Sequence, residues 1–238
     1  MKEAYIRFLA PVIPPTADAL FRIIDKKLRE KVQRLHLLIS SPGGSVFHGL
    51  SAYSFLKGCP MEIYTYNFGS VDSIGVVIYC AGDRRFSVPH ARFLIHGVSV
   101  NFQGNHMLDE KGLEEKLKGL KIDYQNIARV ISDTTEKPAH KVQEDMNNRI
   151  TLSATEAKDY GLVHEIKTDL LPAGADLSVV GEQGLQQQPP EIRMPFPPPS
   201  QAQPEVPGEQ VKHMTQPEVE SLTDTHGIDY GTYFNYIK

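Results

Sequence analysis

Three short segments of the chain carry residue types that together could perform acyl transfer. Ser41-Pro42-Gly43-Gly44 follows a buried apolar run, and such a turn exposes backbone N–H groups to a ligand. Ser73 lies within Gly69–Gly75, where a turn opens an apolar helix whose N-terminus favours negative charge. His96 ends the apolar run Phe93–Ile95. Acyl transfer needs an activated hydroxyl, an imidazole that takes its proton, and donors for the oxyanion.

Each of these signals also has an ordinary structural explanation. A Gly-Gly pair often forms only a turn, a serine such as Ser73 often caps a helix, and a histidine at a strand end is often structural. The adjacent Asp72 fits a helix cap or a first-turn acid better than a catalytic group. We expect His90, on the loop after Pro89, to be exposed and dispensable.

The elements that must position these residues alternate between strand and helix. Short apolar runs predict strands, and apolar residues at helical spacing predict helices. The expected strands are 5–8, 35–40, 61–66, 92–95 and 162–166. The expected helices are 16–32, 46–57, the apolar part of 69–81, a long one over 113–131, and one that starts at the capping box 153–156 and stops at Gly161. This alternation predicts an α/β fold with mostly parallel strands.

Four strings in this order resemble ClpP, the proteolytic subunit of the Clp protease. They are Ser41-Pro42-Gly43-Gly44, Gly69-Ser70-Val71-Asp72-Ser73-Ile74-Gly75, Pro89-His90-Ala91-Arg92-Phe93-Leu94-Ile95-His96 and Leu152-Ser153-Ala154-Thr155-Glu156-Ala157-Lys158-Asp159-Tyr160-Gly161-Leu162-Val163. The resemblance covers about residues 4–166. Each string is modest alone, but their order and spacing together are specific.

The resemblance implies a crotonase-like α/β fold with a projecting helical handle, here about residues 108–135. It also implies stacked rings, heptameric in the family, that enclose a chamber for unfolded substrates. By position, Ser73 matches the family's nucleophile and His96 its general base. The backbone N–H groups of Gly44 and Ile74 match its oxyanion hole.

The third member of the implied triad departs from the family pattern. The family places an aspartate shortly before the Leu-Ser-Ala string, and an ungapped match puts Arg149 there, which cannot accept a hydrogen bond. A shift of one residue makes Asn148-Arg149 resemble the family's Asp-Arg pair. We therefore expect Asn148 to orient His96 through its amide oxygen, with Asp145 as the alternative. An amide there would give a slow peptidase, because it supplies no negative charge.

The N-terminus also departs from the family pattern, because the first expected strand begins within a few residues of Met1. Family members carry about 20 further residues there, which form axial loops near the ATPase partner. A Clp-type ATPase unfoldase is therefore an open partner, whereas peptides and unfolded proteins are the expected substrates.

The composition of the chain narrows the classes of function and the cellular locations that fit it. The 238 residues carry a net charge of −4, which lacks the basic footprint of nucleic-acid binding. The two cysteines, Cys59 and Cys80, fit a reducing compartment. We find no signal peptide and no apolar run of membrane-spanning length, so we expect a cytoplasmic protein without membrane contact. We expect no cofactor and no metal.

The composition changes near Asp169, and proline and glutamine dominate several stretches beyond it. Such a segment cannot repay the entropy of ordering. We expect a peptidase domain over 1–168 and a flexible tail over 169–238. The aromatic cluster near the end of the tail is either a sticky disordered end or a docking peptide; it comprises Tyr230, Tyr233, Phe234 and Tyr236.

Three functions remain open from the sequence. The first is a serine endopeptidase enclosed in its own ring, which the pairing of Ser73 with His96 favours. The second is an inactive or weakly active ring subunit that scaffolds an active paralogue, which the missing acid at Asn148 favours. The third is an acyl-CoA enzyme of the crotonase class, which shares the fold but usually relies on carboxylates.

Overall fold

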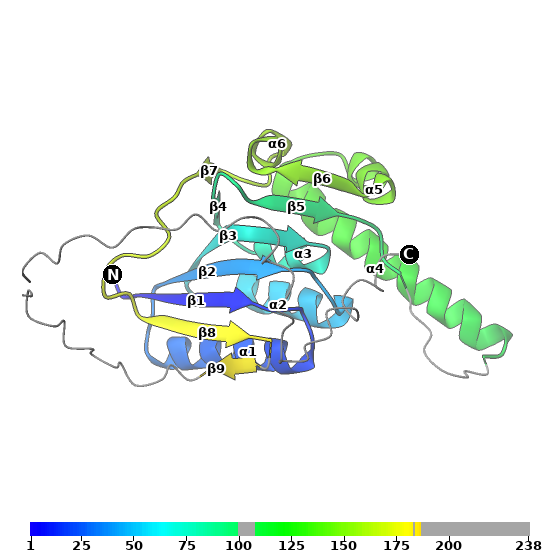
Figure 1. The fold of residues 1–238 in the computed structure, drawn as a ribbon. Coiled ribbons are helices and arrows are strands. Elements are labelled where there is room, and N and C mark those ends of the chain that lie inside the picture. Colours follow the sequence, from blue (N-terminus) through cyan, green and yellow to red (C-terminus); the bar gives the residue numbers. More distant parts are fainter. Residues whose placement is uncertain (100–107, 183, 187–238) are drawn as a thin grey trace, which may run out of the picture. The chain divides into compact units, whose positions relative to one another are not determined.

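The computed structural model describes residues 1–99, 108–182 and 184–186 (Figure 1). The strands are β1 (Glu3–Leu9), β2 (Arg34–Ser41), β3 (Glu62–Asp72), β4 (Arg84–Ser87), β5 (Arg92–Ile95), β6 (Ile150–Ser153), β7 (Glu165–Ile166), β8 (Leu177–Gly181) and β9 (Gly184–Gln186). The helices are α1 (Pro14–Arg29), α2 (Val46–Gly58), α3 (Ile74–Tyr79), α4 (Glu110–Thr135), α5 (Ala139–Asn148) and α6 (Ala154–Tyr160).

One sheet of mostly parallel strands forms the centre of the domain. Its order is β6-β5-β3-β2-β1-β8-β9, and β4 pairs with both β3 and β7. Only β5–β6 and β8–β9 are antiparallel among the described pairs. The long β3 pairs with β4 through Tyr64–Asn67 and with β5 through Ser70–Asp72. The predicted α/β class is therefore confirmed.

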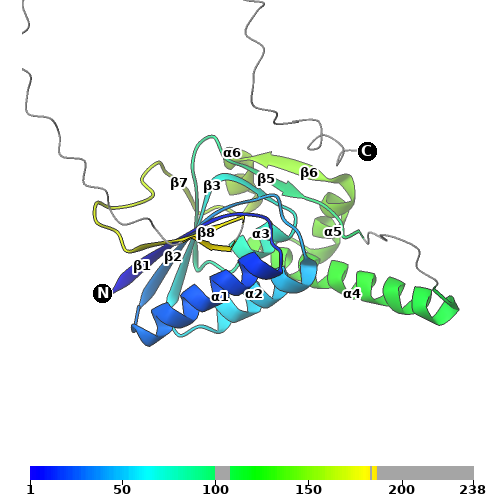
Figure 2. The ribbon, with the colours of Figure 1, turned by 60° about the horizontal axis from the view of Figure 1, so that its bottom comes forward.

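The helices α1 and α2 lie along one face of the sheet (Figure 2). They cover apolar side chains such as Ile6, Leu37 and Ile63, which are almost fully buried. A smaller cluster packs separately around Tyr5, Leu38, Tyr66 and Phe86. Strand β2 contributes to both clusters, which explains why it carries apolar residues on both of its faces.

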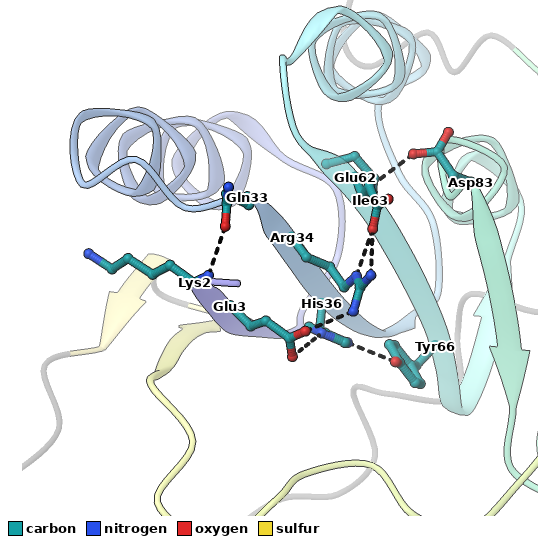
Figure 3. A network of polar contacts seen from close by, with 9 residues as sticks. All are labelled: Lys2, Glu3, Gln33, Arg34, His36, Glu62, Ile63, Tyr66 and Asp83. Carbon is teal, nitrogen blue, oxygen red and sulfur yellow. Dashed lines mark hydrogen bonds and ion pairs between the residues drawn. The ribbon is translucent and has the colours of Figure 1, made fainter.

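Two cross-strand rows of polar residues fix the register of β1, β2 and β3 (Figure 3). In the first row, the Arg34 guanidinium lies 2.8 Å from a Glu3 carboxylate oxygen and 2.7 Å from one of Glu62. In the second, His36 contacts the Tyr66 hydroxyl at 2.8 Å through Nδ1 and Glu3 at 3.2 Å through Nε2. A slip of one residue would turn these partners to the opposite face. The register in turn sets where β2 and β3 end, and the candidate site begins there.

Helix α4 is the predicted handle. Its buried residues, Ile127, Ala128, Val130 and Ile131, all lie in its C-terminal half. The N-terminal half extends away from the sheet in Figure 1 and exposes Leu113, Leu117 and Ile122 by 53%, 53% and 47%. None of the helices within the described ranges combines the length and apolarity needed to cross a membrane.

The folded domain continues past the predicted boundary at residue 168, so that boundary is wrong. Strand β8 pairs in parallel with β1 from Tyr5↔Leu177 to Phe8↔Val180, and β9 turns back against β8. The segment before β8 is held by Asp176, whose carboxylate binds the buried Lys27 ammonium at 2.7 and 2.9 Å. A short apolar strand after a change in composition was the missed signal. The rest of the predicted tail, residues 187–238, lies outside the described residues.

Replacing Asp176 with Asn should weaken this attachment. The Lys27 side chain is 3% exposed and, of its carboxylate partners in the described ranges, would keep only Glu30, 3.6 Å away. Because Asp176 itself is half exposed, we expect a loss of about 2 kcal/mol in the free energy of unfolding, between the values for surface and buried pairs. Urea denaturation at fixed protein concentration measures this loss. The control Asp18→Asn, which breaks the exposed Arg22–Asp18 pair, should cost less than about 1 kcal/mol. Equal effects of the two variants would show that the pair does not anchor β8.

Candidate active site

The structure brings four of the predicted site residues to one small cavity. Ser73, Ile74, His96 and Gly44 line a space of about 70 Å³ between the ends of β2, β3 and β5. The ends of neighbouring parallel strands meet at one edge of a sheet, which is why segments distant in sequence converge here. The two oxyanion-hole candidates thus lie in the same cavity as the candidate nucleophile and base.

Ser73 occupies a strained turn between β3 and α3. Its φ of 57° and ψ of −129° are rarely adopted by a residue with a side chain. The Ser73 N–H donates to the Leu94 carbonyl at 2.8 Å, which ties the turn to β5. A serine on a sharp strand-to-helix turn presents its hydroxyl outward, and this geometry recurs in serine hydrolases. The backbone strain is therefore consistent with a reactive position.

Glycine is required at positions 43 and 44 by close approach. A Cβ on Gly43, whose φ is 90°, would lie 2.5 Å from the Ser73 Cβ. A Cβ on Gly44, whose φ is 145°, would lie 2.3 Å from the Val12 carbonyl oxygen. Val12 donates to the Gly43 carbonyl at 2.7 Å and accepts from the Ser45 N–H at 2.8 Å, so it holds the turn against Ser73.

Two backbone N–H groups remain available to a ligand in the cavity. No described residue accepts a hydrogen bond from the Gly44 N–H. Ile74 is the first residue of α3, so its N–H has no acceptor within the helix. Two such donors beside a serine hydroxyl can stabilise an oxyanion.

His96 is oriented by the backbone of the next residue. Its Nδ1 lies 2.7 Å from the Gly97 carbonyl oxygen. A carbonyl oxygen only accepts, so Nδ1 must carry the proton, and Nε2 of the neutral ring is then left as the base. The Gly97 N–H donates to the Met146 carbonyl at 3.0 Å, which ties this segment to the end of α5. No hydrogen bond joins Ser73 to His96 in the described part of the chain.

Neither predicted third member of the triad bonds to His96 within the described residues. Asn148, the last residue of α5, has an exposed side chain. The expectation that Asn148 holds the imidazole is therefore not met in this structure. The buried Asp145 accepts a hydrogen bond from the Tyr160 hydroxyl at 2.8 Å and is 3.1 Å from the Lys141 ammonium. Burial, with the Asp145 carboxylate beside it, raises the pKa of Tyr160, which keeps that hydroxyl a donor.

Asp72 is neither the helix cap nor the first-turn acid that the sequence suggested, because it ends β3 and Ser73 holds the N-cap of α3. The Asp72 carboxylate accepts from the Ser70 hydroxyl at 2.8 Å and from the Arg92 guanidinium at 2.9 Å. These contacts fasten β3 to β5 directly before Ser73. Among the described residues, no group of three or more His, Cys, Asp or Glu side chains could hold a metal ion.

Two features of the site were missed from the sequence. The apolar walls of the cavity include Val46, Val98 and Ile127, and Ile127 comes from the distant handle helix, which only the fold brings near. A serine–histidine hydrogen bond outside the predicted pair joins Ser45 to Nδ1 of His48 at 2.9 Å, and Ser45 also caps α2. The spacing of Ser45 and His48, one helical turn apart, was the available signal.

A family model described as Clp protease matches residues 9–169, which is more than half of the chain. The chain belongs to the Clp protease family. Among its Clp relatives, the ATP-dependent Clp protease proteolytic subunits of Chlorella vulgaris and Helianthus annuus are 33% and 34% identical to it over 142 residues. These alignments cover 59% and 57% of this chain and 69% of each relative.

A solved Clp structure supports the fold. A ClpP1 mutant from Listeria monocytogenes superposes with a TM-score of 0.63 at 24% identity, over 69% of this chain and 91% of that one. The predicted ClpP-like fold is thereby confirmed.

The Gly97 contact predicts a defined tautomer for His96. At a pH where the ring is neutral, nitrogen NMR should show a protonated Nδ1 and an unprotonated Nε2. The resonance can be assigned with a His96→Gln variant. Asn148→Ala should leave this tautomer unchanged, because the backbone carbonyl holds the ring. A protonated Nε2 would contradict the Gly97 contact. A tautomer that changes in Asn148→Ala would return the orienting role to Asn148.

Proposed function

We propose that this Clp family member is a serine endopeptidase. The observation that carries the proposal is the convergence of Ser73, His96 and two available backbone N–H groups on one cavity. Crotonase-class acyl-CoA chemistry would instead call for carboxylates as acid and base. The Asp72 and Asp145 carboxylates nearby are engaged by Arg92 and by Tyr160.

In the proposed reaction, the Ser73 hydroxyl oxygen attacks the peptide carbonyl carbon while Nε2 of His96 takes the hydroxyl proton. The carbonyl oxygen becomes an oxyanion, which accepts from the N–H groups of Gly44 and Ile74. Collapse breaks the C–N bond, and His96 gives its proton to the leaving amine. Water then attacks the acyl-enzyme, loses a proton to His96 and releases the acid with Ser73 restored.

We infer that the chemistry is slow for the isolated chain. In the charged intermediate, the Gly97 carbonyl can hold Nδ1–H but offers only a partial negative charge to the imidazolium. A carboxylate would stabilise that cation more strongly. The Ser73 hydroxyl must also move toward His96, or His96 toward it, before a proton can pass.

The proposal extends to the assembly and its partners. Leu113 and Leu117, one turn apart on α4, form an exposed apolar stripe that suits an interface between copies, because exposed apolar surface of this kind often marks one. Rings stacked through the handle would enclose the site in a chamber and keep a cytoplasmic peptidase away from folded proteins. Substrates would then be peptides or unfolded chains, delivered to the larger assembly by a Clp-type ATPase.

A second candidate is a ring subunit with little activity of its own. The observations that favour it are the missing Ser73–His96 hydrogen bond and the lack of a carboxylate bonded to His96 among the described residues. Reactivity of Ser73 distinguishes the two candidates.

Ser73 should react with a fluorophosphonate probe. Labelling followed by peptide mapping should place the adduct on Ser73, and both Ser73→Ala and His96→Ala should abolish it. Ser45→Ala is the matched control and should retain labelling, although Ser45 contacts His48. An adduct on Ser45 would overturn the assignment. No adduct in any variant would favour the scaffold.

The handle should mediate assembly. Leu117→Glu places a charge on the apolar stripe of α4 and should lower the oligomer mass seen by native mass spectrometry at micromolar concentration. Leu171→Glu, the same change at a residue exposed by 43% outside α4, should leave that mass unchanged. A monomeric wild-type chain, or equal disruption by both variants, would contradict the role of the handle.

A further inference from the structure

A groove adjoins the Ser73 cavity and runs along the handle helix. Its volume is about 450 Å³, and it shares Gly44, Val46, Val98 and Ser99 with the smaller cavity. The two spaces therefore lie next to each other. A chain whose carbonyl sits at Ser73 would have part of its length in this groove.

The handle forms the far wall of the groove through one stripe of its surface. Lys116, Gly119 and Asp123 lie at helical spacing on the same face, and Ile127, one turn further, lines the Ser73 cavity. At about 1.5 Å per residue, Asp123 is about 6 Å from Ile127 along the axis, and Gly119 about 12 Å. Since an extended peptide advances about 3.3 Å per residue, Asp123 lies near a side chain about two positions from the scissile bond.

Gly119 is a glycine without a packing reason in this chain. It lies in the interior of α4, where glycine is less stable than alanine, and no atom of the described residues lies within 4 Å of the place where its Cβ would be. Gly49 of α2 contrasts with it, because a Cβ there would meet the Ile74 side chain at 2.2 Å. The open surface at Gly119 faces the groove, so it leaves room for a chain that lies against the helix.

Asp123 is a partly buried carboxylate that faces the same groove. Within the described ranges, its side chain takes part in no hydrogen bond or ion pair. The other charged residues that line the groove, Glu115 and Lys116, lie about two turns further from Ser73, and their opposite charges offset each other. The groove is therefore negative at the end nearest the reacting bond.

We propose that this groove binds the substrate chain beside the scissile bond. Gly119 leaves room for that chain on the wall that the handle forms, and Asp123 selects peptides with a lysine or arginine side chain about two positions from that bond. The inference deepens the proposed peptidase function and rests on it for the placement of the scissile bond.

Binding to an inactive variant tests the groove separately from the chemistry. Fluorescence anisotropy on Ser73→Ala would measure the Kd of labelled peptides that differ only in Lys, Gln or Glu at one position near the scissile bond. Adding Asp123→Asn should weaken the Lys peptide about 5-fold, as for a partly exposed ion pair, and leave the Gln peptide unchanged. The control is Asp133→Asn, the same change on the same helix outside the groove, which should leave both peptides unchanged.

Gly119→Ala should raise the Tm, because alanine favours the helix, and yet weaken every peptide. A merely structural glycine would not separate these two effects. Unchanged peptide affinity in Gly119→Ala, or equal losses for the Lys and Gln peptides in Asp123→Asn, would overturn the proposal. An altered oligomer mass in Gly119→Ala with intact affinity would assign the glycine to the interface between copies. If Ser73 in the wild-type chain does not react with the fluorophosphonate probe, the peptidase function is wrong. That result is distinct from failure of the groove proposal, which the peptide affinities measure.

Discussion

The site depends on the contact between the Gly43–Gly44 turn and the strained backbone of Ser73. No side chain fits at position 43, because a Cβ there would lie 2.5 Å from that of Ser73. Parallel pairing of β2 with β3 brings the two turns together, and an irregular register between Ile39 and Ser41 lets both leave the sheet at the same edge. Val12, just after β1, holds the turn from the other side. The adjacent strands β1, β2 and β3 thus fix the positions of the backbone N–H donors and the Ser73 hydroxyl relative to one another.

The handle helix joins this site to the rest of the domain. The C-terminal half of α4, its base, supplies Ile127 to the wall of the cavity. The N-terminal half carries the exposed apolar residues. The buried Arg85 anchors that base, because its guanidinium donates to the carbonyls of Thr134 and Leu162, at the C-terminal ends of α4 and α6. A cation at those ends is favoured by the helix dipoles. One helix therefore links the proposed assembly surface, the proposed substrate groove and the reacting bond.

Local sequence was sufficient to predict the residues that lie where a strand gives way to a turn. Strand pattern, glycine spacing and helix start located the turns at Gly44 and Ser73. The oxyanion-hole roles of Gly44 and Ile74 were implied only by the resemblance to ClpP. Asn148 could not be placed, since tertiary packing decides how the end of α5 meets the segment after His96, and no local pattern reports that packing. Strand β8 was missed because its few apolar residues gain stability only by pairing with β1, more than a hundred residues earlier. Ile127 likewise reaches the cavity only through the fold.

The central claim is that the strained Ser73 turn and the two backbone N–H groups act on the same substrate carbonyl. The most direct measurement is a crystal structure of the fluorophosphonate adduct. The account predicts phosphorus bonded to the Ser73 oxygen, with one phosphoryl oxygen about 3 Å from both the Gly44 and Ile74 nitrogens. A phosphoryl oxygen turned to solvent, with neither nitrogen within hydrogen-bond distance, would contradict it.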